Sequence, residues 1–282
     1  MKNYFAVCFI IIVILSSFII IKADDKLSVE EILTKHLDSI GTADKRKLIT
    51  NQLAIGVSEF SILRNSGSKT FGNAVIVSQA GKVMLGTKYN SLDYPSEKVS
   101  FDGNKVEIAF ITPGLRSPFG NFIFSNKQVF SEGLFGGTLS SSWALFDIQS
   151  RNAKLNSNGK KKLDGREVYV LEYSPRRGSS STIKLYFDAQ NFQHLRTEYR
   201  QTFSAAQGKT PEQSSQQLES KQILTEDFSD YKVENGLTLP HKYRIHLLLD
   251  GRGTNEFEWK FEFSNFLFNQ NLEANSFDVN AE

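Results

Sequence analysis

The sequence predicts a mainly β fold of the α+β class, in which one amphipathic helix precedes an antiparallel meander. Apolar and polar residues alternate with a period of two from about Leu53 onward. Tight-turn dipeptides separate these alternating segments. No long helical pattern lies between them, so a parallel α/β sheet is not expected.

Composition narrows the possible functions. The 282 residues include 40% hydrophobic residues and 19 glycines, which is typical of a folded chain of one or two domains. A net charge of +2 gives no overall basic excess of the kind that nucleic-acid or anionic-membrane binders carry. A single cysteine excludes a disulfide framework, a CxxC pair and a cysteine-based zinc site. The 23 phenylalanines are the unusual feature and suggest an aromatic core or cavity.

Residues 1–23 form a targeting segment. Lys2 precedes an uncharged apolar stretch from Tyr4 to Ile21, and Ala23 is the best cleavage position for a signal peptide. The stretch is also long enough for an uncleaved anchor in the inner membrane, which would give membrane contact through residues 4–21. Either alternative exports residues 24–282, which we expect to form one domain in the periplasm or another exported location. That part contains 31 basic and 31 acidic residues and no cysteine, since Cys8 lies in the apolar stretch.

The first folded element is a helix. Ser28 and Glu31 have the spacing of a capping box, in which each side chain binds the other residue's backbone amide. Apolar residues then follow at helical spacing from Val29 to Ile40, and Gly41 ends the pattern. Residues 44–48 add a short basic turn.

Strands and hairpin turns make up most of the remainder. Dipeptides that favour tight turns occur at Asp102-Gly103, Asp164-Gly165, Asn235-Gly236 and Asp250-Gly251, and residues 79–81 form a further turn. The strands expected around these turns are 70–77, 83–87, 98–101, 106–111, 167–173, 182–187, 195–200, 242–249 and 256–263.

The strand 256–263 shows how the sheet is oriented. Phe257, Trp259, Phe261 and Phe263 point to one face, while the four alternate residues are charged and point to the other. Residues 183, 185 and 187 and residues 243, 245, 247 and 249 repeat this apolar face. The sheet therefore has one solvated face and one aromatic face.

Two segments interrupt the pattern. Residues 113–147 are rich in Gly and Phe, include Phe135 and Trp143, and should form loops and helical turns over the apolar face. Residues 204–221 are rich in Gln and Ser and resemble a hairpin insertion.

The search for catalytic and metal-binding motifs finds no nucleophile elbow, phosphate-binding loop or dinucleotide fingerprint, so we expect no enzyme activity and no cofactor. His241 and His246 face opposite sides of one strand, so no metal site is expected. One face of the strand around residues 195–200 carries a row of polar and charged side chains, His194, Arg196, Glu198 and Arg200. This row is either a solvated surface or an anion-binding site. The only acid–base candidates are Asp227 and Asp230 near Tyr231, and Asp147 beside Trp143, all expected at turns or strand ends. The basic runs 160–162 and 176–177 are expected in solvated loops and not at nucleic acid.

Four segments resemble one known family. They are Val29–Leu33 with Gly41, Lys162–Leu171, Ile183–Asp188 with His194–Arg196, and Asn235–His241. Together they are similar to the LolA/LolB-like lipoprotein-carrier superfamily, particularly to outer-membrane lipoprotein-sorting-type proteins. The resemblance spans residues 28 to about 266 and rests on turn-and-strand motifs.

The resemblance implies a strongly bent antiparallel sheet, an incomplete barrel whose concave face is covered by a few helices. It also implies an exported lipid- or acyl-chain-binding protein of the bacterial envelope, a carrier or sorting factor whose partner is a lipid or an acylated protein. The candidate lining residues are Phe257, Trp259, Phe261, Phe263, Phe135 and Trp143. The alternative is an envelope sensor or protein-interaction module with a filled core, which an exposed apolar patch on the sheet edge or on residues 113–147 would favour.

Overall fold

The structure, a computed structural model, describes residues 27–64, 67–204 and 219–281. The expected targeting segment, its cleavage position Ala23 and most of the expected 204–221 insertion lie outside these residues. The helices are α1 (Val29–Ile40), α2 (Ala43–Lys47), α3 (Pro118–Ser125), α4 (Lys127–Ser131) and α5 (Ile148–Arg151), with 3-10 turns η1 (Gly137–Leu139) and η2 (Ala144–Asp147). The strands are β1 (Asn51–Ile62), β2 (Lys69–Gln79), β3 (Lys82–Tyr89), β4 (Ser96–Phe101), β5 (Val106–Ile108), β6 (Lys154–Leu163), β7 (Arg166–Ser174), β8 (Thr182–Asp188), β9 (His194–Phe203), β10 (Ser220–Glu234), β11 (Leu237–Asp250) and β12 (Thr254–Phe268).

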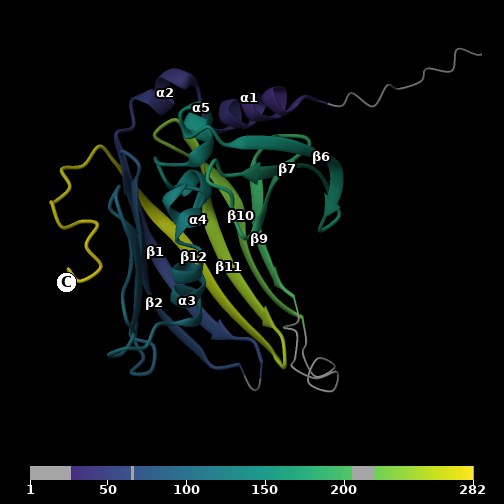
Figure 1. The fold of residues 1–282 in the computed structure, drawn as a ribbon. Helices are drawn as coiled ribbons and strands as arrows, with labels where there is room; N and C mark the ends of the chain where they lie inside the picture. Colours follow the sequence, from purple (N-terminus) through teal and green to yellow (C-terminus); the bar gives the residue numbers. More distant parts are fainter. Residues whose placement is uncertain (1–26, 65–66, 205–218, 282) are drawn as a thin grey trace, which may run out of the picture.

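All twelve strands form one antiparallel sheet in the order β5-β4-β3-β2-β1-β12-β11-β10-β9-β8-β7-β6. The sheet consists of two meanders, β1–β5 and β6–β12, which are joined by the pairing of β1 with β12. It is strongly curved and does not close into a barrel (Figure 1). The mainly β fold and the bent, open antiparallel sheet are therefore confirmed.

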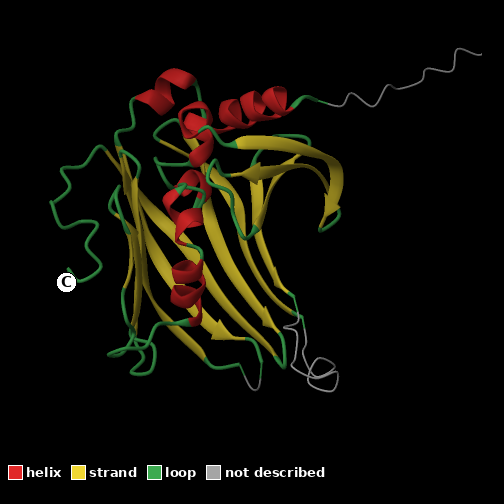
Figure 2. Cartoon of the chain, viewed as in Figure 1, coloured by secondary structure: helices red, strands yellow, loops and turns green. Residues whose placement is uncertain are grey.

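The topology explains why a helical segment lies across the concave face. β5 and β6 are consecutive in sequence but form the two opposite edges of the sheet. The connection between them, residues 109–153, must therefore cross from one edge to the other. It contains α3, α4, η1, η2 and α5 and runs in front of the curved strands (Figure 2). We call this segment the cover.

The local signals predicted the turns correctly. The four expected dipeptides connect β4 to β5, β6 to β7, β10 to β11 and β11 to β12. At Asp164-Gly165 and Asn235-Gly236 both residues have positive φ, as tight hairpin turns require. A bulge between Ile55 and Gly56 disrupts the pairing with β12, and a Cβ at Gly56 would lie 2.0 Å from the Glu262 carbonyl oxygen. Glycine is needed there because the two backbones approach so closely.

The helix α1 closes one end of the half-barrel together with α2 (Figure 1). The expected capping box is present, with the Glu31 amide donating to the Ser28 hydroxyl at 3.2 Å and the Ser28 amide donating to the Glu31 carboxylate at 2.7 Å. Ile32, His36 and Ile40 are its buried residues and share one face of the helix. Within the residues that the structure describes, no helix is long and apolar enough to cross a membrane.

Several sequence-based expectations are wrong. Residues 160–162 lie in β6 and not in a loop, and Asp227 lies in the middle of β10 and not at a strand end. β5 ends at Ile108, before the expected residue 111. Glu258 is buried on the charged face of β12, because Arg244 and Lys260 cover and pair with it.

The expected charged row on β9 is wrong for His194 only, since Arg196, Glu198 and Arg200 share the outer face. The register of β8 with β9 shifts between Tyr186 and Phe187, because β9 has an extra residue, Leu195, between His194 and Arg196. His194 therefore points into the core, whereas Arg196 lies on the outer face beside Asp227. Period-two reasoning fails at that point because one extra residue reverses the faces.

Candidate functional site

The concave face of the sheet is lined with aromatic side chains, as the alternation predicted. Trp259, Phe261 and Phe263 of β12 are buried there, whereas Phe257 is only partly buried at the end of the row. The ring of Trp259 lies 5.1 Å from that of Phe60 on β1 and 5.5 Å from that of Phe119 on α3, measured between centroids. The sheet and the cover therefore meet in a close-packed aromatic layer.

The two candidates from the cover lie in the same layer. Phe135 packs against Phe119 and Phe130 at 5.4 Å and against Tyr243 of β11 at 6.3 Å between centroids. Trp143 stacks on His194 at 4.9 Å. Five of the six predicted lining residues thus belong to one buried apolar cluster, and Phe257 packs against it. Their role in ligand binding stays a prediction.

An apolar cavity of about 280 Å3 lies at the end of this interface that α1 and α2 close. Its lining comes from α1, α2, β1, β11 and the cover. The apolar lining residues are Leu37, Ile40, Ala43, Ile49, Phe146, Leu237 and Leu239, and the polar ones are Arg46, Lys47, Gln52, Thr138 and Ser141. The cavity therefore combines an apolar wall with two cations from one short helix.

The two cations differ in how they are held. Arg46 donates from Nη1 to the carbonyl oxygens of Leu37, at 2.5 Å, and of Gly41, so it joins α2 to the end of α1. Lys47 forms no ion pair within the described part of the chain and is exposed. The sequence predicts that both residues lie in a short basic turn, but it does not predict that they line a cavity. Leu237 and Leu239 of β11, which complete the cavity, lie about 190 residues further along, so no local signal could have revealed it.

A buried carboxyl group, Glu226, connects the sheet to the cover. Its Oε1 accepts hydrogen bonds from the Gly136 amide at 2.7 Å and the Tyr243 hydroxyl at 2.6 Å, and its Oε2 accepts one from the Tyr199 hydroxyl at 2.6 Å. Burial raises the pKa of Glu226 to about 7 despite these three donors. Sequence reasoning missed this group, although its alternation with Leu224 and Phe228 indicates an inward position.

Glu97 of β4 is a second buried carboxyl group. Its Oε2 accepts a hydrogen bond from the Tyr94 hydroxyl at 2.5 Å, and that hydroxyl accepts one from the Trp259 indole at 2.9 Å. Burial raises the pKa of Glu97 to about 7. Burial therefore raises the pKa of two carboxyl groups in the interior to near neutral pH.

The histidines His36 and His194 are both buried beside Trp143. The Trp143 indole donates to Nε2 of His36 at 3.3 Å, so Nδ1 of His36 carries the proton and donates to the Phe192 carbonyl oxygen at 3.0 Å. Burial lowers the pKa of His36 to about 4 and also lowers the pKa of His194. Both rings are therefore neutral at pH 7 and act as polar parts of the core.

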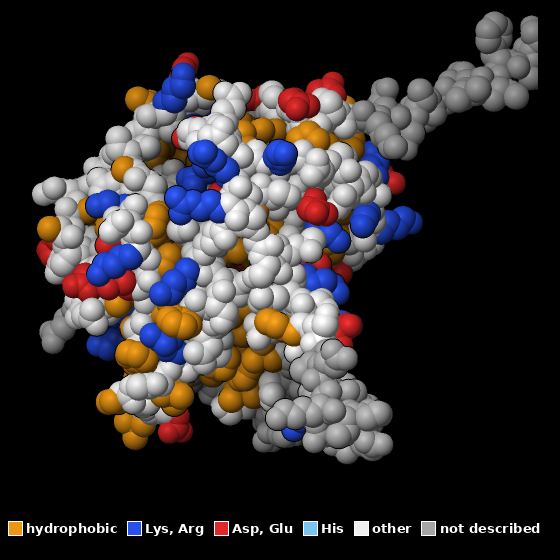
Figure 3. All heavy atoms as spheres, in the orientation of Figure 1, with side chains coloured by type: hydrophobic (Ala, Val, Ile, Leu, Met, Phe, Trp, Pro, Cys, Tyr) orange, Lys and Arg blue, Asp and Glu red, His pale blue; other side chains and the backbone are white. Residues whose placement is uncertain are grey.

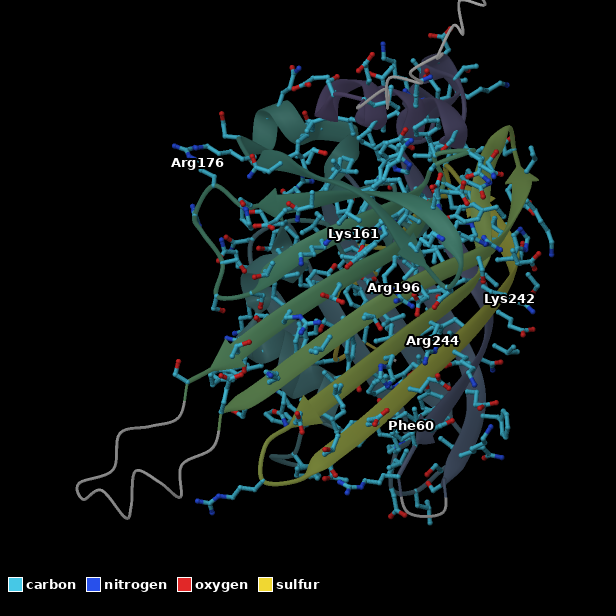
Figure 4. The ribbon with its side chains drawn as sticks, turned by 90° about the vertical axis from the view of Figure 1, so that its right-hand side faces the viewer. Phe60, Lys161, Arg176, Arg196, Lys242 and Arg244 are labelled. Atoms are coloured by element: carbon cyan, nitrogen blue, oxygen red, sulfur yellow. The ribbon has the colours of Figure 1, made fainter. Side chains whose placement is uncertain are left out.

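The acid–base candidates are not brought together, because Asp227 lines a pocket of about 280 Å3 whose lining includes neither Asp230 nor Asp147. Asp227 pairs with Arg196 at 2.5 Å and Arg244 at 3.0 Å on the outer face of the sheet. Figure 4 shows Arg196 and Arg244 next to each other on this face, with the helices behind the strands. Asp230 pairs with Lys232, and Asp147 accepts a hydrogen bond from Ser150. Among the described residues no group of His, Cys, Asp and Glu could hold a metal ion.

Comparison with solved structures finds several similar chains. The chain is similar to a LolA superfamily protein from Nitrosomonas europaea, with 12% identity over 89% of this chain and 97% of that one and a TM-score of 0.48. It is also similar to a putative outer membrane lipoprotein-sorting protein domain from Vibrio parahaemolyticus, with 15% identity over 87% and 97% and a TM-score of 0.38. The MucA/MucB complex of Pseudomonas aeruginosa matches with 11% identity over 82% and 94% and a TM-score of 0.22.

The similarity is confined to solved structures. No protein-family model matches the sequence. No curated protein matches it.

Proposed function

We propose that the protein is an exported lipid-binding protein of the bacterial envelope that holds an acyl chain in the cavity at the α1–α2 end. The observation that carries this proposal is the apolar cavity of about 280 Å3 with Arg46 and Lys47 in its wall. Apolar walls with a few placed polar groups are typical of small-molecule sites, and this volume is near the lower end of their range. Holding an acyl chain requires apolar contacts and a cation for the head group, and no catalytic residue, so we propose a carrier and not an enzyme.

The energetics favour an amphiphile with an anionic head. Each methylene group that leaves water contributes about 0.8 kcal/mol, so a segment of about eight contributes roughly 6 kcal/mol before ordering costs. Lys47 has no ion-pair partner in the described chain and is free to bind a carboxylate or phosphate at the mouth. A carrier or sorting role, with an acylated protein as the bound partner, is the specific form of this proposal.

The aromatic layer extends the proposed site. Phe257, Trp259, Phe261, Phe263, Phe135 and Trp143 would contact a longer chain only after the cover separates from the sheet, because they pack against each other and their neighbours in the closed form. The cavity at the α1–α2 end is therefore the first part of the site that a ligand reaches.

Fluorescence titration with a dansyl-labelled undecanoic acid tests the proposal. Ala43 is exposed and lines the cavity, so Ala43→Trp should fill part of the cavity with an indole ring and strongly weaken binding of the fatty acid. Asp44→Trp is the matched control, because Asp44 is adjacent on α2 and outside the cavity lining. Lys47→Glu should weaken binding of the acid, whereas Lys45→Glu, on the same helix but not in the lining, should not. Equal affinities for each variant and its control would refute the site.

The alternative is an envelope sensor or protein-interaction module whose core is filled. The close packing of the aromatic layer favours this alternative. Native mass spectrometry of the gently purified protein distinguishes the two functions. A co-purified acyl species supports the carrier, whereas proximity labelling that returns one stable protein partner without lipid supports the module.

A further inference from the structure

Three exposed apolar side chains gather around two cations near the N-terminal part of the cover. Phe110, Leu115 and Phe124 are 49%, 54% and 47% exposed. Arg116 and Lys127 lie against the two phenylalanine rings. We call these five residues the Arg116 patch. Figure 3 shows apolar side chains gathered with Lys and Arg side chains at the end of the molecule away from α1 and α2.

The cations are held in place by the rings. The Arg116 guanidinium carbon lies 4.4 Å from the centroid of Phe110 and 4.4 Å from that of Phe124, and Lys127 Nζ lies 4.6 Å from the centroid of Phe124. Neither cation forms an ion pair with a carboxylate in the part of the chain that the structure describes. The Nε of Arg116 has no hydrogen-bond partner among those residues. The patch therefore presents positive charge that the described protein does not neutralise.

The backbone fixes the position of the patch. The Leu115 amide donates to the Thr112 carbonyl oxygen at 2.9 Å, and the Ile111 amide donates to the Leu115 carbonyl oxygen at 2.9 Å, so Leu115 closes a tight turn. Ser117 then caps α3 by accepting a hydrogen bond from the Gly120 amide at 2.7 Å. Leu115 and Arg116 thus lie between a turn and a helix cap, so little ordering entropy opposes binding.

We propose that the Arg116 patch docks the protein onto the surface of an anionic phospholipid membrane. Apolar side chains beside Lys and Arg suit the membrane interface, where rings and aliphatic groups enter the acyl boundary while cations bind phosphate groups. Charge complementarity selects an anionic surface, because two cations lie together without a carboxylate. The net charge of +2 for the whole chain does not reveal this patch, because it says nothing about where Arg116 and Lys127 lie on the surface.

Co-sedimentation with lipid vesicles tests the proposal. The chain starting at Asp24 is used, because it keeps every described helix and strand and lacks the apolar segment that would bind vesicles by itself. We expect binding to phosphatidylglycerol vesicles that weakens with added salt, and weak binding to phosphatidylcholine vesicles. Arg116→Gln and Lys127→Gln should each lower the affinity for phosphatidylglycerol about fivefold, since each cation near such a surface has an effect of this order. The Phe110→Ser/Phe124→Ser variant should weaken binding at every salt concentration.

Phe71→Ser with Lys88→Gln is the matched control, since both residues are exposed on β2 and β3 outside the patch. The control should bind as the wild type does, and circular dichroism should show the same fold for all variants. Equal binding to both lipids, or equal binding by patch and control variants, would overturn the proposal. A change of oligomeric state or the loss of a protein partner in the patch variants, without any vesicle binding, would also overturn it.

Discussion

The buried carboxyl group of Glu226 makes a sharp prediction for the variant Glu226→Gln. The glutamine oxygen can still accept hydrogen bonds from the Gly136 amide and the Tyr243 hydroxyl, and its amide group can donate to the Tyr199 hydroxyl oxygen. The substitution therefore preserves the shape and the connections of the group but removes its ability to ionise. Any effect that depends on pH then reports the burial of the charge.

The sign and size follow from the two pKa values. In the unfolded chain the carboxyl group has its ordinary pKa of 4.5, whereas burial raises the pKa of Glu226 to about 7 in the fold. Between these values the folded protein binds the extra proton, so its free energy of unfolding falls as the pH rises and is lowest above pH 7. The difference between the two pKa values corresponds to on the order of 3 kcal/mol. Glu226→Gln should therefore be more stable than the wild type by that order at about pH 8.5 and close to it at about pH 5.

Urea unfolding followed by tryptophan fluorescence provides the measurement, because Trp143 and Trp259 are both buried. The free energy of unfolding is compared between variant and wild type in steps from about pH 5 to about pH 8.5. The other buried groups do not disturb this difference. Glu97 makes stability fall over the same pH range, while the lowered pKa of His36, about 4, makes stability rise with pH up to about 6.5, but both act equally in the two proteins.

Glu262→Gln is the control, because Glu262 is exposed on the outer face of β12 and the chemical change is the same. Its difference from the wild type should stay constant with pH. If the difference for Glu226→Gln also stays constant between about pH 5 and pH 8.5, the carboxyl group does not take up its proton near neutral pH and the reasoning fails.

Three further predictions concern stability in denaturant or on heating. Phe119→Ala should lower the free energy of unfolding by about 3–5 kcal/mol, because the ring fills the space between Trp259 and Phe135; a loss below about 1 kcal/mol would indicate a loosely packed layer. Gly133 has a φ of +72°, and a Cβ at this position would lie 2.4 Å from the Ser142 carbonyl oxygen. Gly133→Ala should therefore lower the free energy of unfolding in urea by about 2 kcal/mol or more. Wild-type stability of this variant would contradict the backbone conformation. Ser28→Ala should lower the melting temperature by about 2–4 °C through loss of the cap, and an unchanged melting temperature would show that α1 does not depend on it.

The sequence was sufficient where the physical cause is local. The capping box of α1 lies within four residues, and each hairpin turn depends on two adjacent residues such as Asn235-Gly236. The inner face of β12 followed from alternation because Trp259, Phe261 and Phe263 occupy successive positions on one side of a strand. These features were predicted correctly because neighbouring residues alone determine them.

Features that depend on distant pairing could not be predicted in the same way. The bulge that turns His194 into the core has its extra residue, Leu195, in β9, but only the pairing with β8 reveals it. The cavity at the α1–α2 end requires Leu37, Phe146 and Leu237 to meet, although roughly 90 residues or more separate each of them from the next. Glu226 is intermediate, since its alternation with Leu224 and Phe228 indicates an inward position but no local pattern indicates its bonds to Gly136 and Tyr199.

The contacts of the cover indicate how a lipid could reach the aromatic layer. In the closed form the Gly136 amide binds Glu226, the Thr138 carbonyl oxygen accepts from Gln52, and Trp143 binds His36. All three contacts lie between Gly136 and Trp143, so they attach the middle of the cover to the sheet and to α1. In the proposed function, a short chain in the cavity would lie beside Thr138, whereas a longer chain would have to break these contacts to pass beneath the cover. Under the proposed function, a long acyl chain would therefore bind at the α1–α2 end first, and the cover would separate second.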